Sequence, residues 1–220
     1  MKRILVLLMV AAYGVAVPVS TKESLAAMKP ADALEKLKQG NGRFVSGASG
    51  PRDLKAQVKA TASGQYPFAA VLSCMDSRVP PEMVFDQGIG DLFVVRVAGN
   101  VIDSDDLGSL EYGTKVVGSK LIIVMGHTSC GAVKGAIEDV QLGNLTMLLE
   151  KIRPVVKASG PGDAHDAAYV DRVAEANVRQ SIREMREKSP TIRELADSGK
   201  IGIAGAMYDV STGKVTFLAD

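Results

Sequence analysis

The segment Ser-Cys-Met-Asp-Ser-Arg-Val, residues 73–79, brings a soft metal ligand, a carboxylate and a guanidinium within five positions. These groups belong to Cys74, Asp76 and Arg78. A second reactive segment, Gly-His-Thr-Ser-Cys-Gly, contains His127 and Cys130. Both cysteines of the chain and one of its two histidines therefore fall in two short segments.

Two thiolates and one imidazole favour a zinc ion, which prefers sulfur and nitrogen ligands in tetrahedral geometry. Three protein ligands leave the fourth position to water or to a carboxylate, which is the pattern of a catalytic site, and zinc lowers the pKa of a bound water to about 7. Asp76 is close enough to Cys74 in the chain to accept a hydrogen bond from the resulting hydroxide. Arg78 could hold Asp76 through a bidentate contact.

The same residues allow simpler interpretations. In a protein exported to an oxidising compartment, Cys74 and Cys130 could instead form a disulfide. Asp76 would then cap the next segment and Arg78 would be a surface charge. A disulfide gives His127 no role, so the zinc interpretation is favoured. An exported module that binds metal or oxidises reversibly through its two thiols is the non-enzymatic alternative.

The elements around these residues predict an α/β fold with a mainly parallel central sheet. Three apolar runs without polar alternation indicate buried parallel strands: residues 68–72, 92–97 and 121–125. Helical segments at 81–87 and 109–117 lie between them and imply right-handed crossovers. Cys74 and His127 follow the first and third strands. If these strands are neighbours, both residues lie at the carboxyl edge of the sheet, where open α/β sheets bind ligands.

The remaining elements flank this sheet. A helical arm starts at Pro30 and is expected to end at Gly40. A loop with a short helix follows, over residues 46–67. The longest predicted helix spans 166–188, another starts at Ser189-Pro190, and two strand-like runs around 211–213 predict a C-terminal hairpin.

Length and composition limit the classes of protein that fit. A chain of 220 residues with 46% apolar residues suits one sizeable domain. The net charge of +1 and the lack of a basic block argue against nucleic acid as a partner. Two cysteines are too few for a disulfide framework.

The first residues resemble a secretory signal. Lys2 and Arg3 precede an uncharged, mostly apolar run over 4–17, which is shorter than the roughly 20 residues that span a bilayer. Gly14-Val15-Ala16 supplies a small-x-small cleavage pattern. We expect a signal peptide at 1–16, one domain at 17–220, a periplasmic or secreted protein, and no stable membrane anchor once the signal is removed.

The two reactive segments, Cys-Met-Asp-Ser-Arg and Gly-His-Thr-Ser-Cys-Gly-Ala, resemble those of the β-class carbonic anhydrases. The similarity runs from Pro30 to the C-terminus and includes the segments GNGRFVSG, VVRVAGN and SLEYG. It implies one Zn²⁺ per subunit on Cys74, His127 and Cys130, with Asp76 and Arg78 as a catalytic dyad. It also implies reversible hydration of carbon dioxide to bicarbonate by a homodimer or homotetramer whose active site lies at the subunit interface.

Further positions match the family one at a time. Gln65 matches a glutamine that hydrogen-bonds the substrate, often from the neighbouring subunit. Phe93 and Tyr112 match apolar groups of the carbon dioxide pocket, and Ala98 stands where valine is common. Gly131 would offer its backbone N–H to bicarbonate.

Three further expectations come from the resemblance. In some members the aspartate takes the fourth zinc position in a closed state, a role that would fall to Asp76. Arg96 matches an arginine of a second bicarbonate site in some members, but Val71 replaces the tryptophan of that site. Relatives on the same scaffold hydrolyse carbon disulfide or carbonyl sulfide, which is the enzymatic alternative for this chain.

Overall fold

The centre of the protein is a five-stranded sheet with the strand order β2-β1-β3-β4-β5, in a computed structural model that describes residues 19–219. Its strands are β1 (Ala69–Ser73), β2 (Leu92–Arg96), β3 (Leu121–His127), β4 (Gly202–Tyr208) and β5 (Val215–Phe217). The pairs β1–β2, β1–β3 and β3–β4 are parallel, whereas β5 runs antiparallel to β4. The predicted mainly parallel sheet with a C-terminal hairpin is confirmed, and β1 and β3 are neighbours.

The strands differ in burial according to their place in the sheet. Every residue of β1 and of β3 is buried. The prediction that the second apolar run, now β2, is covered on both faces was wrong, because β2 lies at the sheet edge and its residues are half-buried or exposed. An apolar run alone does not tell a central strand from an edge strand that lacks a neighbour in the isolated chain.

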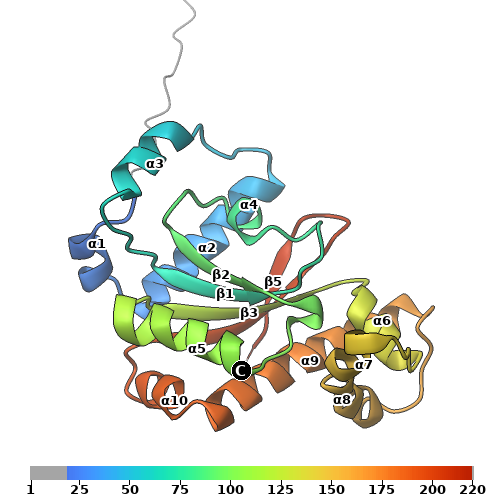
Figure 1. Ribbon diagram of the computed structural model, residues 1–220. Helices are drawn as coiled ribbons and strands as arrows, with labels where there is room; N and C mark the ends of the chain where they lie inside the picture. Colours follow the sequence, from blue (N-terminus) through green and yellow to red (C-terminus); the bar gives the residue numbers. More distant parts are fainter. Residues whose placement is uncertain (1–18, 220) are drawn as a thin grey trace, which may run out of the picture.

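Helices cover both faces of the sheet (Figure 1). One face packs against α2 and α4 through a cluster that includes Leu37, Val71, Phe85 and Met125. The other face packs against α5, α9 and α10. The helices are α1 (Lys22–Ala27), α2 (Pro30–Val45), α3 (Leu54–Thr61), α4 (Pro81–Val84), α5 (Ser104–Glu111), α6 (Gly131–Ile137), α7 (Gly143–Glu150), α8 (Arg153–Ala158), α9 (Ala167–Lys188) and α10 (Pro190–Asp197).

The predicted end of the first long helix was wrong. Helix α2 begins at Pro30 as expected but continues past Gly40 to Val45. Gly40 is buried where α2 crosses α4, and a Cβ there would lie 1.8 Å from the carbonyl oxygen of Phe85. This glycine is therefore needed for the close approach of two segments and does not end the helix.

Two other helical segments have different limits from those predicted. The segment 81–87 is helical only over α4 and then turns. The segment 109–117 begins earlier, as α5, and continues as a π-helical turn, η2 (Tyr112–Val117). Helix α9 matches its prediction within one residue, since Asp166 caps it by accepting from the amides of Ala168 and Tyr169.

A separate group of helices, α6 to α8, lies beyond the carboxyl ends of the strands and packs on α9 (Figure 1). Their buried cluster includes Cys74, Cys130, Leu149, Ile152 and Val173. Between β2 and α5, a short 3₁₀ turn, η1 (Ala98–Asn100), contacts the same region. The sheet edge, η1 and these helices together enclose the predicted site.

Within residues 19–219, none of the helices is both long enough and apolar enough to cross a membrane. The predicted signal peptide at 1–16 lies outside the described residues. Its boundary with the domain at 17–220 stays a prediction.

Candidate metal centre

Cys74, His127 and Cys130 meet at the carboxyl edge of the sheet. Cys74 follows β1 and His127 ends the neighbouring β3, while Cys130 immediately precedes α6. Their candidate ligand atoms all lie within 4.8 Å of one another. All three residues are buried. The structure thus brings together the three side chains that the sequence predicted as ligands.

The imidazole of His127 is oriented for a metal. Its Nδ1 lies 2.9 Å from the carbonyl oxygen of Thr128, which can only accept, so Nδ1 carries the hydrogen. Nε2 then presents a lone pair, and it is buried without a hydrogen-bond partner among the described residues. Leaving such an acceptor unpaired is costly, and metal-binding histidines are typically held through their other nitrogen in this way.

The two neighbouring thiols have pKa values shifted in opposite directions. A hydrogen bond from Cys130 lowers the pKa of Cys74 to about 4; burial opposes this shift, and the backbone N–H of Gly99 adds to it. The same thiol–thiol bond, together with burial, raises the pKa of Cys130. Negative charge is therefore concentrated on Cys74, and a cation at this position would release the remaining proton. The buried sulfur and nitrogen donors fit zinc.

Asp76 and Arg78 form the predicted pair beside these ligands. Arg78 donates from Nε to Oδ1 at 2.9 Å and from Nη2 to Oδ2 at 2.7 Å, and its backbone N–H also donates to Oδ1 at 2.9 Å. These bonds from Arg78 hold the pKa of Asp76 well below its usual range, despite some desolvation. Oδ2 lies 3.9 Å from Nε2 of His127. The carboxylate is thus ionised and next to the side of the imidazole that is free to bind metal.

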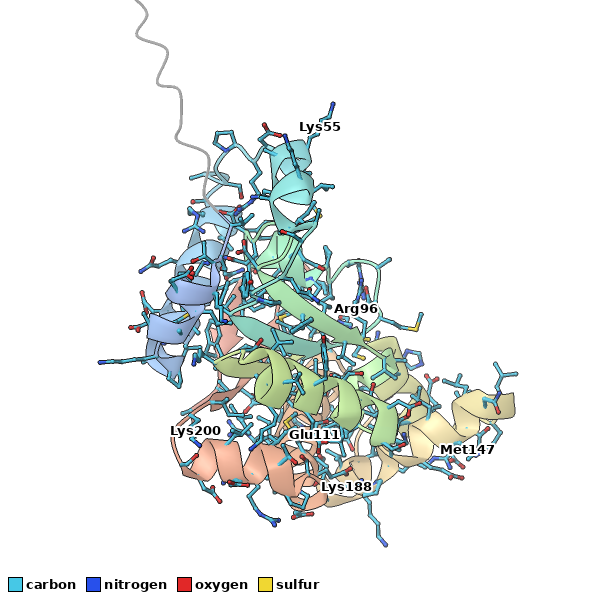
Figure 2. The ribbon with its side chains drawn as sticks, turned by 60° about the vertical axis from the view of Figure 1, so that its left-hand side comes forward. Lys55, Arg96, Glu111, Met147, Lys188 and Lys200 are labelled. Atoms are coloured by element: carbon cyan, nitrogen blue, oxygen red, sulfur yellow. The ribbon has the colours of Figure 1, made fainter. Side chains whose placement is uncertain are left out.

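Arg96 fixes the backbone between these residues. It lies at the end of β2 (Figure 2) and donates to the carbonyl oxygens of Cys74 at 3.1 Å and Asp76 at 2.5 Å. The family resemblance in the sequence predicts only a different role for Arg96, as part of a second bicarbonate site. A contact from a side chain to the main chain of another strand leaves no sequence pattern, so this role was not predicted.

Two of the five predicted substrate residues flank the metal ligands. Ala98 is half-buried in η1, one residue before Gly99, whose N–H lies 3.3 Å from Sγ of Cys74. Gly131 directly follows Cys130, and a Cβ built on it would meet no atom within 4 Å. Open space therefore lies beside the Gly131 backbone.

The other three lie elsewhere in the chain. Gln65 is exposed before β1, whereas Cys74 follows this strand of five residues, which spans about 16 Å. Phe93 is paired with Ala70 near the start of the strands, and the ring of Tyr112 packs edge-on against it at 6.1 Å between centroids. Gln65, Phe93 and Tyr112 are therefore not brought to the metal ligands of their own chain.

Asn177 and Asp171 of α9 were also missed by the sequence analysis. Asn177 is 2% exposed and donates to the carbonyl oxygen of Gly99, and Asp171 accepts from the backbone N–H of Ser129, between His127 and Cys130. The signal available for Asn177 was a polar residue at helical spacing from the apolar positions Val170 and Val173.

Comparison with known proteins gives consistent matches. A family model described as "Carbonic anhydrase" matches residues 69–215. Carbonic anhydrase 2 of Mycobacterium tuberculosis is 38% identical over 190 residues, which cover 84% of this chain and 91% of that protein. A carbonic anhydrase of Mycolicibacterium smegmatis is 37% identical over 194 residues, covering 84% and 92%. A tetrameric β-carbonic anhydrase structure from Sordaria macrospora superposes with a TM-score of 0.66 at 26% identity, covering 76% of this chain and 91% of that one.

Proposed function

The chain belongs to the carbonic anhydrase family, in its β class, and from that premise we propose that it hydrates carbon dioxide with one zinc ion per subunit. Cys74, His127 and Cys130 would hold the ion. The observation that carries the proposal is the buried Nε2 of His127, which has no hydrogen-bond partner among the described residues and lies within 4.8 Å of both sulfur atoms. A soft dication satisfies the nitrogen and both thiolates at once.

When bound, zinc would supply a Lewis acid that makes a water molecule nucleophilic near neutral pH. The chain's own residues would then orient the reactants. Asp76 stays ionised beside Arg78 and would accept a hydrogen bond from the attacking water, fixing the direction of its lone pair. The N–H of Gly131, which borders open space, would donate to an oxygen of the developing bicarbonate.

A second copy of the chain would complete the substrate pocket. Gln65, Phe93 and Tyr112 lie away from the metal ligands of their own chain, so they would serve the site of a partner. The edge strand β2 supports this arrangement, since Phe93, Val94 and Val95 line a hollow of about 660 Å³ together with Tyr112, which is 50% exposed. We therefore propose a homodimer through this edge, or a homotetramer such as that named for the Sordaria macrospora protein.

Export is proposed from the first residues alone, which combine a basic start, an apolar run and a small-x-small pattern. The protein would then act in a periplasm or outside the cell. N-terminal sequencing of the protein purified from its own cells, after fractionation, tests this. A start near residue 17 in the exported fraction supports export, and an intact Met1 in the cytoplasmic fraction contradicts it.

The decisive experiment compares the wild-type protein with Cys74→Ser by stopped-flow hydration of carbon dioxide and by zinc content. Met75→Leu is the matched control, because Met75 lies in the same turn and is 64% exposed. We expect fast hydration and about one zinc per chain in the wild type and the control, and loss of both in Cys74→Ser. Fast hydration by zinc-free Cys74→Ser would overturn the proposed metal site.

The comparisons give no support to the alternative functions, since the matched proteins are carbonic anhydrases. Turnover of carbon disulfide and carbonyl sulfide by the same preparation would test the hydrolase alternative directly. Thiol titration would test the dithiol module, because zinc removal from a zinc–thiolate site exposes two free thiols, whereas a disulfide yields none.

A further inference from the structure

Helix α9 contacts the backbone segments beside the metal ligands. Asn177 is a polar residue among the buried apolar residues of this helix and is only 2% exposed. Its Nδ2 donates to the carbonyl oxygen of Gly99 at 2.7 Å. A buried amide is retained at such a position only if its hydrogen bond offsets the cost of desolvation.

Gly99 connects this contact to the metal site. The carbonyl of the Gly99–Asn100 peptide is held by Asn177, and its N–H donates to the carbonyl oxygen of Val97 at 2.9 Å. One peptide plane is therefore fixed on both sides. The torsions of Gly99, φ 68° and ψ 16°, join it to the preceding plane, whose N–H points at Sγ of Cys74 at 3.3 Å.

Any other residue at position 99 would be strained in this geometry. The φ of Gly99 lies in the left-handed region, and a Cβ would lie 2.6 Å from Cδ1 of Ile152 and 3.2 Å from Cβ of Ala132. Two side chains of α9 hold carbonyl oxygens of this turn, Asn177 at Gly99 and Ser181 at Asn100.

The same helix holds the second ligand segment. Asp171, six residues before Asn177, accepts from the backbone N–H of Ser129 at 2.9 Å. Ser129 lies between His127 and Cys130 and has a φ of 55°. One helix thus fixes the backbone next to Cys74 and the backbone between the other two ligands.

We propose that Asn177 is a positioning residue for the metal site, acting through Gly99 on the Cys74 sulfur. An N–H aimed at a thiolate withdraws electron density from it and fixes its direction, so it affects both the affinity for the metal and the electronic structure of the metal–sulfur bond. The inference rests on the proposed zinc site. In this proposal, a residue that does not bind the metal itself affects the Cys74 thiolate and not the other two ligands.

The test uses the full-length wild-type protein, Asn177→Leu and Asn177→Ala, each loaded with zinc or with Co²⁺. Zinc affinity is measured by competition with a chelator, and the thiolate-to-cobalt charge-transfer band by absorption. We expect both variants to bind zinc about 10- to 100-fold more weakly and to shift the cobalt band. If Asn177→Leu does not fold, the same measurements on Asn177→Ala still test the proposal.

Ser181→Ala is the matched control. Ser181 is on the same helix, is 4% exposed and donates to the carbonyl oxygen of Asn100 at 2.9 Å, one peptide further from the sulfur. We expect it to lower the thermal midpoint while keeping the wild-type cobalt band. Wild-type affinity and band position in the Asn177 variants would overturn the inference, as would an equal shift in Ser181→Ala. If the wild type binds neither metal through Cys74, the proposed zinc site itself fails.

Discussion

At the scale of single residues, Asp76 combines two properties that chemistry at this site requires. It is held by two side-chain nitrogens of Arg78, so it stays ionised, and one of its oxygens lies 3.9 Å from the metal-facing nitrogen of His127. It can therefore orient a water molecule without acting as a permanent ligand. Conservative substitutions of Asp76 and Arg78 should therefore distinguish the orientation of the water molecule from the binding of the metal.

Asp76→Asn is expected to lower the rate of carbon dioxide hydration by about 10²-fold or more while zinc content stays near one per chain. The amide keeps the shape of the carboxylate but loses its charge and its bidentate contact with Arg78. Stopped-flow rates and metal analysis on the same sample measure the two effects. Arg78→Lys should lower the hydration rate less than Asp76→Asn does. Lysine keeps the positive charge but lacks the two parallel N–H donors of the guanidinium. An Asp76→Asn rate near that of the wild type would contradict the role.

Gly99→Ala and Gly47→Ala form a matched pair, since both glycines have a φ of 68°. Each alanine pays about 1–2 kcal/mol for the left-handed conformation. Gly99→Ala should cost a further ~1–3 kcal/mol, because its Cβ meets Ile152 at 2.6 Å, whereas that of Gly47 meets nothing within 4 Å. Urea unfolding measures both. If both variants lose the same free energy of unfolding, the η1 turn can move to accommodate the added Cβ without cost.

At the scale of elements, the site depends on how closely α9 packs against the sheet. Gly126 of β3 makes this approach possible: a Cβ there would lie 2.7 Å from Cγ2 of Val178 on α9 and 2.9 Å from Sδ of Met207 on β4. The residue adjoins His127. Any change that separates α9 from β3 would therefore also move the His127 side chain.

Gly126→Ala is expected to lower the free energy of unfolding by about 1–3 kcal/mol through overpacking, and to weaken zinc binding. Gly42→Ala is the control, because Gly42 lies inside α2 with no atom within 4 Å of its Cβ position. That change should stabilise the protein by roughly 0.5–1 kcal/mol. Urea unfolding and chelator competition would measure both variants, and a neutral effect at Gly126 would contradict the close packing.

An ion cluster around the buried Asp86 joins α2, the loop before α3 and the turn after α4, and it gives a pH-dependent prediction. Asp86, 6% exposed, accepts from Arg43 at 2.6 Å and from Arg52 at 2.8 Å. Burial raises the pKa of Asp86, but the two arginines outweigh it and the net shift is downward. The cluster therefore contributes stability above the unfolded pKa of about 3.9, and this contribution is lost as the pH falls through the lower folded pKa.

Arg52→Ala should therefore lower the free energy of unfolding by about 1.5–3 kcal/mol at pH 7, and the difference from the wild type should shrink below about pH 4. Urea unfolding at several pH values measures it. Arg179→Ala is the control, because it removes an exposed ion pair with Glu175. It should lower the free energy of unfolding by less than about 1 kcal/mol. A difference that stays constant down to pH 3 would show that Asp86 is not the group involved.

At the scale of the whole molecule, the proposed active site would need residues from a second chain. The edge strand β2 is apolar and half-exposed, and three predicted substrate residues lie toward it or before β1. A change at this edge should therefore affect assembly and catalysis together. A change on a distant exposed surface should affect neither.

Val94→Asp, in the middle of β2, is expected to convert the proposed oligomer to monomers and to abolish most hydration, since a buried carboxylate would oppose the proposed apolar interface. Light scattering coupled to gel filtration gives the mass, and stopped flow gives the rate. Met147→Asp is the control, because Met147 is 68% exposed on α7, away from β2 (Figure 2). A fully active Val94→Asp monomer would contradict the shared site.

The sequence by itself predicted the group of metal ligands and most of the architecture. The apolar runs before Cys74 and at 121–125 predicted buried parallel strands, and the polar residues after them predicted the metal group, because residue type and periodicity are local properties. Helix α9 was also predicted within one residue, since its apolar spacing and its cap Asp166 are both visible in the chain.

The tertiary structure alone decided which residues support the site and which strand lacks a neighbour. Arg96 and Asn177 act on backbone atoms of distant segments, at Cys74 and Gly99, and such contacts leave no periodic pattern. Gly40 was misread as a helix end because its need for close packing arises from Phe85, on another element. The half-exposed position of β2 likewise follows from strand order, which depends on how the chain crosses over and not on the composition of the strand.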